Sequence, residues 1–180
     1  MSNKPRVFVA AYFRQGITQD PQSVQLGTAR FHWAIWIEPK GSMGPGACYQ
    51  VYSEDTYRNV PGSGGWNYNY RPTADYTRSG SMIGRLMIGK LPPGVTCDDV
   101  DAVLSRLPLP RENVHPIENC VTWTMAAIEQ LQARGWADMF DIRTFMDWAL
   151  RTVTEWYRSK GGRGWIGVFL KTNFTNRKFP

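Results

Sequence analysis

The order of secondary-structure patterns along the chain predicts an α+β fold, in which an antiparallel sheet packs against helices. Short runs of β-branched and aromatic residues fill the first half of the sequence, and longer helical patterns follow them. Strands and helices do not alternate as in a parallel βαβ array, and no GxGxxG or phosphate-loop motif occurs. A chain of 180 residues can bury a hydrophobic core without help from disulfides or a structural metal, so we expect one domain over residues 1–180.

The expected strands are short runs rich in apolar, β-branched and aromatic residues. They cover residues 6–13, 29–38, 47–53, 81–91 and, near the C-terminus, 165–170. Pro39 ends the second run, and the glycine-rich residues 41–46 connect it to the third. These two strands are therefore expected to form a hairpin.

Two segments between the expected strands lack a strand pattern. Residues 14–28 are polar and contain glycine and proline, so they predict a loop. Residues 55–79 are rich in Gly, Asn, Tyr, Pro and Arg, and they predict a long surface loop with at most a short strand at 66–70. Long loops in compact domains are often functional.

The second half of the chain carries helical patterns at residues 96–106, 119–134 and 141–160. Thr96 and Asp99 have the spacing of a capping box, with Asp in place of the usual Glu or Gln. Gly135 is expected to close the middle helix. One face of that helix should pack on the sheet. It carries Thr124, Ala127, Ile128 and Leu131.

The net charge of +6 is concentrated at the C-terminal end of the chain. Residues 156–180 contain six basic side chains and no acidic one. Such a segment can bind an anionic partner or form an ordinary solvated face. Its basic residues form no recognised nucleic-acid motif, so we do not expect nucleic acid as a partner.

Cys48, Cys97 and Cys120 are an odd number of cysteines without a CxxC pair. This pattern predicts neither a disulfide framework nor a zinc cluster, and free thiols fit a reducing compartment. No apolar run reaches the length of a membrane span, and residues 1–5 lack the apolar region of a signal peptide. We therefore expect a cytoplasmic protein.

A metal cofactor is not expected either. Asp98, Asp99 and Asp101 cluster at the start of an expected helix, where capping and the helix dipole explain them. We expect no metal ion and no other cofactor.

Cys120 lies at the expected start of the middle helix. The free N–H groups and the positive end of the helix dipole favour a thiolate at that place. The same N–H groups can donate hydrogen bonds to a developing oxyanion. A buried cysteine that serves as a small apolar side chain is the alternative interpretation.

His32 begins the second expected strand and shares a face with Ala34 and Trp36. A histidine among apolar residues is also typical of a protein core. Gln50, on the partner strand, can accept a hydrogen bond from one imidazole nitrogen, and it is equally typical of an exposed strand residue. His115, five residues before Cys120, is an alternative base, although it is more typical of an ordinary loop histidine.

Two segments resemble a known family. His32-Trp33-Ala34-Ile35-Trp36-Ile37 resembles the HWAIYV strand of the lecithin–retinol acyltransferase-like proteins and their small phospholipase/acyltransferase relatives. Asn119-Cys120-Val121-Thr122-Trp123 resembles the NCEHFV helix start of that group, and Phe13-Arg14 resembles its FR pair. The chain is also similar to small uncharacterised fungal proteins with an HWALW-type strand and an NCQ-type helix start. The acyltransferase-like families belong to the permuted NlpC/P60, papain-like group, in which histidine precedes cysteine, as it does here.

The resemblance implies a circularly permuted papain-like domain that transfers acyl groups, as a hydrolase or an acyltransferase, through a thioester. The substrate would be an amide or ester, either a small molecule or a peptide. Cys120 would be the nucleophile, His32 the general base and then the general acid, and Gln50 the group that orients the ring. Gln50 replaces the second histidine of the acyltransferases, although papain-like sites also use Asn in this third position. The oxyanion would accept hydrogen bonds from the Cys120 N–H and from a hydroxyl such as that of Tyr12, the latter by analogy with a tyrosine of related hydrolases.

Two departures from the acyltransferase pattern limit what the resemblance implies. Val121-Thr122 replaces the Glu-His pair after the cysteine, and the C-terminal hydrophobic anchor of many such enzymes is missing. Acyl transfer at a lipid membrane is therefore not expected. A catalytically inactive binding module on the same fold, and binding of anionic partners through the basic tail, are the alternative functions.

Several aromatic and basic side chains are candidates for substrate binding. Trp36 lies on the His32 face of its strand, and further candidates follow in the 55–79 segment. These are Tyr57, Trp66, Tyr68, Tyr70 and Arg71. They could grip an aromatic or acidic substrate, and a solvated loop with a few packed aromatics would explain them equally well.

Overall fold

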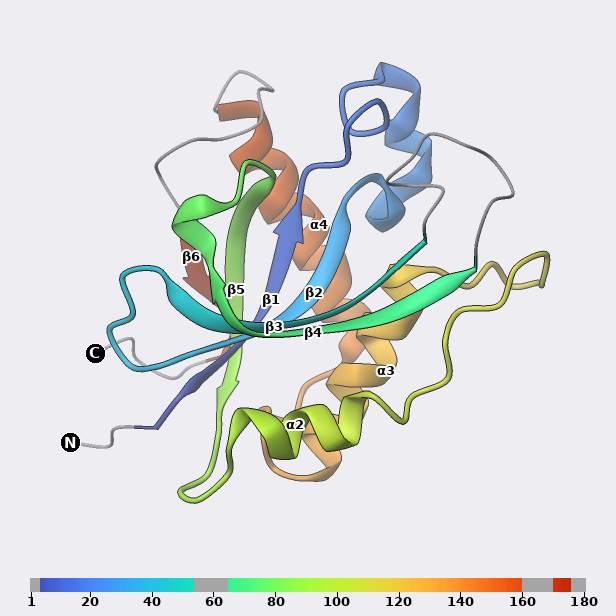
Figure 1. Cartoon of the computed structure of the whole chain (residues 1–180). Helices are drawn as coiled ribbons and strands as arrows, with labels where there is room; N and C mark the ends of the chain where they lie inside the picture. Colours follow the sequence, from blue (N-terminus) through green and yellow to red (C-terminus); the bar gives the residue numbers. More distant parts are fainter. Residues whose placement is uncertain (1–3, 54–64, 160–169, 176–180) are drawn as a thin grey trace.

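A six-stranded sheet forms the centre of the molecule, with the strand order β4-β3-β2-β1-β5-β6 (Figure 1). This computed structural model describes residues 4–53, 65–159 and 170–175. The strands are β1 (Arg6–Tyr12), β2 (His32–Glu38), β3 (Pro45–Ser53), β4 (Trp66–Asp75), β5 (Met82–Lys90) and β6 (Leu170–Asn173). Neighbouring strands are antiparallel except β5 and β6, which are parallel.

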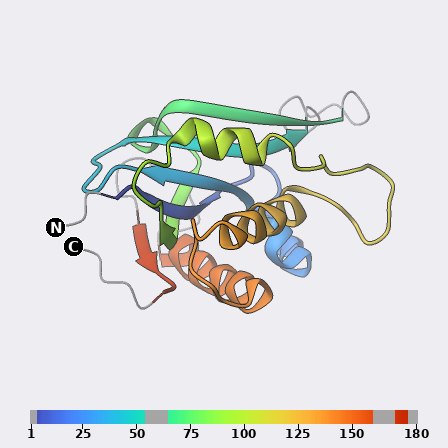
Figure 2. The ribbon, with the colours of Figure 1, turned by 90° about the horizontal axis from the view of Figure 1, so that it is seen from below.

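Helices cover one face of this sheet, where they lie next to one another (Figure 2). They are α2 (Cys97–Leu104), α3 (Cys120–Ala133) and α4 (Ile142–Ser159). α3 packs on β2 and β3, α4 packs on β5, and α2 packs against β3 and β4. Two short 3-10 helices, η1 (Pro21–Arg30) and η2 (Tyr76–Arg78), complete the described elements.

The two faces of the sheet carry different cores, because side chains alternate along each strand. On β2, Trp33 and Ile35 are fully buried under the helices. Ala34 and Trp36 point to the opposite face, where they join Cys48 in a smaller apolar cluster. The alternation on residues 29–38 is the one that the sequence predicts, and it leaves His32 on the face without α2, α3 and α4.

The α+β class, with strands in the first half and helices after them, is confirmed. Helix ends also lie where the sequence places them. Thr96 and Asp99 form a reciprocal capping box at the start of α2. Asn119 caps α3, and Gly135 follows α3 with a positive φ of 67°, the conformation that glycine adopts most easily.

Two expected loops contain regular structure. Residues 14–28 were expected to be a loop, but η1 begins at Pro21 behind the cap Asp20. Residues 66–75 form the full edge strand β4 rather than a short strand within a long loop. Pro72 obscures this strand in the sequence, and it is tolerated because β4 lies at the sheet edge, next to a break in the β3–β4 register. Residues 55–64 lie outside the described part of the chain.

The expectation of a purely antiparallel sheet is wrong at one edge. β6 returns after α4 and pairs parallel with β5. A helical crossover between two strands is the usual way to make them parallel. The expected last strand at 165–170 falls outside the described residues except for Leu170, where β6 begins.

Candidate active site

The N-terminus of α3 places Cys120 beside His32 and Trp33, the first two residues of β2. The side chain of Asn119 accepts a hydrogen bond from the Val121 N–H at 2.8 Å, and the Asn119 N–H donates to Thr122 Oγ1 at 2.9 Å. These bonds fix the first helical turn, so Cys120 occupies its first position with a buried side chain. The N–H of that position has no acceptor within the helix.

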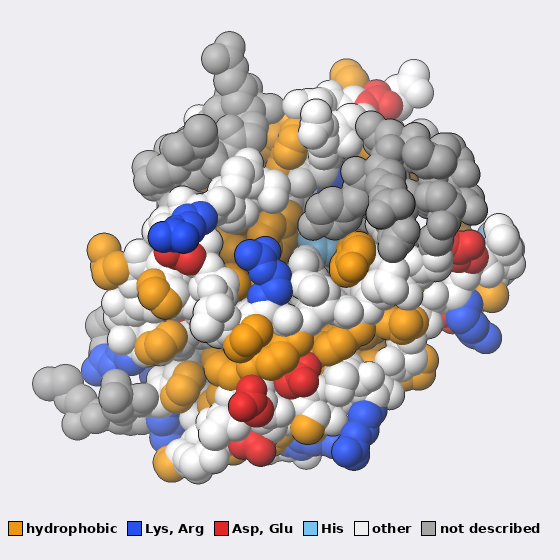
Figure 3. Space-filling model, viewed as in Figure 1, with side chains coloured by type: hydrophobic (Ala, Val, Ile, Leu, Met, Phe, Trp, Pro, Cys, Tyr) orange, Lys and Arg blue, Asp and Glu red, His pale blue; other side chains and the backbone are white. Residues whose placement is uncertain are grey.

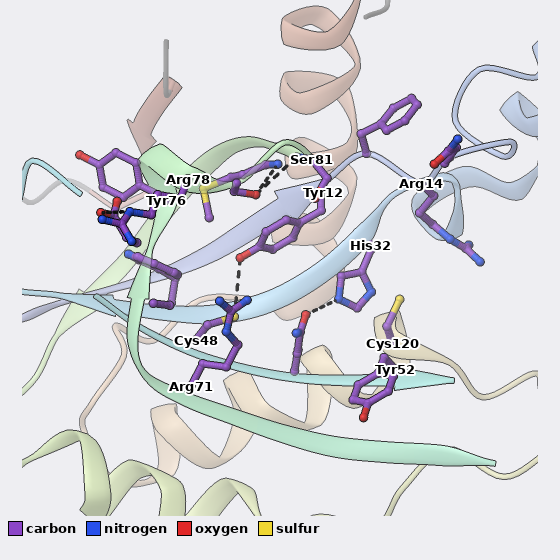
Figure 4. Close-up of a pocket in the computed structure, with 18 of the residues that line it drawn as sticks. Tyr12, Arg14, His32, Cys48, Tyr52, Arg71, Tyr76, Arg78, Ser81 and Cys120 are labelled. Carbon is purple, nitrogen blue, oxygen red and sulfur yellow. Dashed lines mark hydrogen bonds and ion pairs between the residues drawn. The ribbon is translucent and has the colours of Figure 1, made fainter. Parts of the chain in front are cut away.

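His32 connects Cys120 to Gln50. The imidazole Nε2 lies 2.8 Å from Gln50 Oε1 (Figure 4). The Cys120 thiol is a second hydrogen-bond partner of the ring. Because an amide oxygen only accepts, Nε2 carries a proton, which leaves Nδ1 for the thiol. The three side chains come from α3, β2 and β3, and they are the three that the sequence predicts to act together.

The pKa values of the pair shift in opposite directions. Burial raises the pKa of Cys120, but the hydrogen bond and charge of His32, the Trp33 backbone N–H and the charge of Arg14 outweigh it. The pKa of the thiol therefore ends below its ordinary value. Burial lowers the pKa of His32, but the hydrogen bond and charge of Cys120, together with Gln50, outweigh it and raise that pKa. The arrangement favours a thiolate beside an imidazolium.

Two backbone N–H groups, those of Trp33 and Cys120, are relevant to the chemistry of the Cys120 sulfur. The N–H of Trp33 donates a hydrogen bond to the Cys120 thiol, and the Cys120 N–H is unused within the helix. The hydroxyl of Tyr12, by contrast, lies 3.6 Å from Cys48 Sγ and points away from Cys120 (Figure 4). The structure therefore does not bring the Tyr12 hydroxyl to the position expected of an oxyanion donor, and the α3 N-terminus is the better candidate.

A cavity of about 620 Å³ opens beside the thiol on the sheet face that is free of α2, α3 and α4. A volume of this size is typical of small-molecule sites. Figure 3 shows a hollow on this side of the molecule, with histidine in its floor and apolar and basic side chains around it. Cys120, His32 and Gln50 line one end of the cavity.

Of the six expected substrate-binding residues, three line this cavity, two face the helices and one lies outside the described residues. Trp36, Trp66 and Arg71 are lining residues. Tyr68 was expected there, but it lies on the face of β4 opposite Arg71, on the helix side, where its hydroxyl donates to Asp101 at 2.7 Å. Tyr70 also faces the helices, and its hydroxyl donates to Asp98 at 2.8 Å. Tyr57 lies outside the described residues.

Arg14 is the functional candidate that residue-by-residue reasoning did not single out. Arg14 lines the cavity, and its charge lowers the pKa of both Cys120 and His32. A hydrogen bond from Arg14 to the Ala29 carbonyl holds the side chain in place. The Phe13-Arg14 pair was the available signal, because it was part of the family resemblance. His115, the alternative base, is exposed and is not a lining residue.

The sequence predicts no metal site and no membrane span, and the described residues can be searched for both. Within the described ranges, no group of three or more His, Cys, Asp or Glu side chains could hold a metal ion. Asp98 and Asp101 accept hydrogen bonds from tyrosines, and the Asp99 carboxylate accepts from the Thr96 N–H at 2.8 Å in the capping box of α2. In the same ranges, no helix combines the length and apolarity needed to cross a membrane.

Gln50 is expected to be a positioning residue for the imidazole. Gln50→Leu should slow alkylation of Cys120 by iodoacetamide about fivefold, because a neutral hydrogen bond contributes about 1 kcal/mol. The bond to Gln50 raises the pKa of His32, so its loss should also lower the pKa of the imidazolium seen in the pH–rate profile. Gln50→Glu, which keeps an acceptor, should restore the rate.

A matched control for this substitution is Asn67→Leu, which removes an exposed amide from β4. That variant should alkylate at the wild-type rate. An unchanged pH–rate profile in Gln50→Leu would show that Gln50 does not act on His32.

Comparison with known proteins identifies a family but no characterised relative. A family model described as a family of unknown function (DUF6914) matches residues 4–162. This range contains strands β1 to β5 and helices α2 to α4, and it includes Cys120, His32 and Gln50. No curated protein and no solved structure matches the chain.

Proposed function

The chain belongs to the family of unknown function DUF6914, and we propose from its site that it is a thiol-dependent acyl-transfer enzyme, a hydrolase or an acyltransferase. One observation carries this proposal: Cys120 and His32 are hydrogen-bond partners at a helix N-terminus, while Gln50 accepts from the other ring nitrogen. A nucleophile, a base and a group that orients the base are the parts that covalent acyl transfer needs.

In the first half of the proposed reaction, the Cys120 thiolate attacks the carbonyl carbon of an amide or ester. The carbonyl oxygen becomes an oxyanion, which the Cys120 N–H stabilises. The C–N or C–O bond then breaks, and the imidazolium of His32 gives its proton to the leaving amine or alcohol. A thioester on Cys120 and a neutral imidazole remain.

In the second half, His32 acts as the base. It takes a proton from water or from an acceptor amine or alcohol, whose N or O attacks the thioester carbon. The C–S bond breaks, and the sulfur returns as thiolate beside the imidazolium. Gln50 holds the ring through both steps, so the same nitrogen faces the reacting atoms throughout.

We further propose that the domain is a circularly permuted relative of the NlpC/P60, papain-like group. His32 begins a central strand that precedes the helix of Cys120 in the chain, which is the permuted order. The polar third group comes from the neighbouring strand β3. We also propose a cytoplasmic location, because Cys48, Cys97 and Cys120 are free thiols and free thiols fit a reducing compartment.

The proposal predicts that iodoacetamide labels Cys120 much faster than the other cysteines near neutral pH. Burial raises the pKa of Cys48 to about 11, and burial also raises the pKa of the half-buried Cys97. Only the Cys120 thiol has a lowered pKa among the three. Time-resolved labelling and peptide mass spectrometry should therefore show Cys120 modified at least about tenfold faster than either of the others.

An activated ester extends the same test. Wild-type protein should form a Cys120 acyl adduct that hydroxylamine removes, and Cys120→Ser should form none at that position. Equal and slow labelling of all three cysteines, without an acyl adduct, would favour the inactive binding module on the same fold.

A further inference from the structure

The end of the cavity away from Cys120 contains a cation without a partner. Arg71 lies on β4 opposite Cys48 on β3, and its guanidinium reaches into the cavity toward Cys48 and Tyr12 (Figure 4). Its charge acts on both of these groups, because it lowers the pKa of each. No described acceptor pairs with Arg71.

The other charges that line the cavity are already engaged. Arg14, at the end of the cavity that Cys120 and His32 line, donates a hydrogen bond to the Ala29 carbonyl. Asp75 accepts from the Thr77 N–H at 2.8 Å and lies 3.8 Å from Arg78. Asp75 is the one acidic residue among the described lining residues, so the described cavity has an excess of positive charge. Among the lining arginines, Arg78 has Asp75 beside it and Arg14 has a carbonyl acceptor, whereas Arg71 has neither a counter-ion nor an acceptor in the described part of the chain.

The groups around Arg71 cannot neutralise it. Burial raises the pKa of Tyr12 well above its ordinary value, and it raises that of Cys48 to about 11, so both stay protonated at neutral pH. The Tyr12 hydroxyl has only the Cys48 sulfur, at 3.6 Å, as a described partner. Sulfur is a weak acceptor, so the O–H of this half-buried tyrosine can donate to a stronger acceptor. Trp36 and Tyr76 supply an apolar wall.

We propose that Arg71 and Tyr12 form a carboxylate-binding subsite, so that the substrate is an amide or ester with a free carboxylate at some distance from the reacting carbonyl. This inference rests on the proposed thiol chemistry. A guanidinium fork matches the planar carboxylate, and the tyrosine hydroxyl adds a third donor. A single free guanidinium and one hydroxyl suit a monoanion better than a phosphate dianion.

The distance between Arg71 and the thiol makes the subsite testable through chain length. The probes are N-bromoacetyl derivatives of ω-amino acids, from glycine to longer members. Their carboxylate lies farther from the reactive carbon as the chain lengthens, and each acid has a neutral primary amide counterpart. The Cys120 thiolate displaces bromide, so the S–C bond forms as the C–Br bond breaks. The acid should react about tenfold faster than its amide at the length that reaches Arg71, because hydrogen bonds to charged groups are worth more than neutral ones.

Variants assign this preference to Arg71. Arg71→Gln should reduce the ratio of acid to amide rates about tenfold, to near one, and Arg71→Lys should retain part of it. The control is Arg151→Gln, an exposed arginine of α4 outside the cavity, which should keep the full ratio. The overall charge of +6 attracts every anion, so a preference that does not depend on chain length would overturn the subsite.

A binding measurement separates this inference from the proposed function. N-acetyl-ω-amino acids cannot alkylate, and calorimetry on Cys120→Ala protein should detect the acid of the matching length but not its amide. Arg71→Gln in the same background should abolish binding. Equal acid and amide rates with a fast-reacting Cys120, and no binding of the acids, would overturn the subsite while the thiol function stands. An inert Cys120 with Arg71-dependent binding would overturn the enzyme and leave the subsite.

Discussion

Replacing His32 by alanine is expected to lower the rate of Cys120 alkylation near neutral pH by about a hundredfold or more. Burial raises the pKa of this thiol, and the hydrogen bond and charge of His32 are the largest effects that oppose it. Without the imidazole, burial dominates and the pKa of Cys120 rises. The thiolate is the reactive form, so its fraction at pH 7 falls. Any acyl transfer would lose its proton carrier as well.

The pH dependence gives the clearest measurement of this loss. The wild-type rate should begin to rise with pH below the ordinary pKa of a thiol and should be close to its plateau near neutrality. The His32→Ala rate should rise only in the alkaline range. His115→Ala is the matched control, because it removes the exposed histidine that does not line the cavity. Identical profiles for the wild type and both variants would rule out the dyad.

The catalytic cluster could be predicted from sequence because each member depends on a short-range pattern. Alternation along β2 puts His32 on the same face as Trp36, and the hairpin brings Gln50 of β3 beside it. Asn119 in the capping position makes Cys120 the first residue of α3. None of these inferences needs the path of a long loop or the rotamer of a long side chain.

The remainder of the site depends on longer-range geometry. The side of β4 that Tyr68 faces follows from the register of an edge strand whose alternation Pro72 obscures. The direction of the Tyr12 hydroxyl follows from the position of Cys48, two strands away in the sheet. Arg14 reaches the dyad only because the segment up to η1 folds back on the Ala29 carbonyl. Local patterns do not encode these contacts.

A buried ion pair under the far end of the cavity was also not apparent from the sequence. Arg85 lies within the apolar pattern of β5, and its Nε is 2.9 Å from Glu38 Oε2 on β2, with both side chains about 98–99 % buried. The Trp36 indole N–H donates to the same carboxylate at 2.8 Å. The Arg85 guanidinium lies 3.7 Å from the ring centre of Tyr76, which lines the cavity. The pair therefore supports the apolar wall of the proposed subsite.

Glu38→Ala is expected to reduce the free energy of unfolding by about 3–5 kcal/mol, because it leaves the buried guanidinium of Arg85 without a counter-ion. Chemical denaturation monitored by tryptophan fluorescence would measure the loss. The double variant Glu38→Leu/Arg85→Met should recover most of the stability, since it removes both charges and fills similar volume. The pair thus acts through the cost of an unpaired charge, rather than through a large net attraction between its members.

The Arg111–Glu118 pair supplies the matched control. Its Nη2–Oε1 distance of 2.6 Å is shorter than the Nε–Oε2 distance of the buried pair, but Arg111 is 72 % exposed and Glu118 is 26 % exposed, against 1–2 % for the buried pair. Water and salt screen an exposed pair, so Glu118→Ala should leave the denaturation midpoint nearly unchanged despite its shorter contact. If both single substitutions cost the same, burial would not determine the energetics. If the double variant were as unstable as Glu38→Ala, the loss would come from packing around Trp36 and Tyr76 rather than from an unpaired charge.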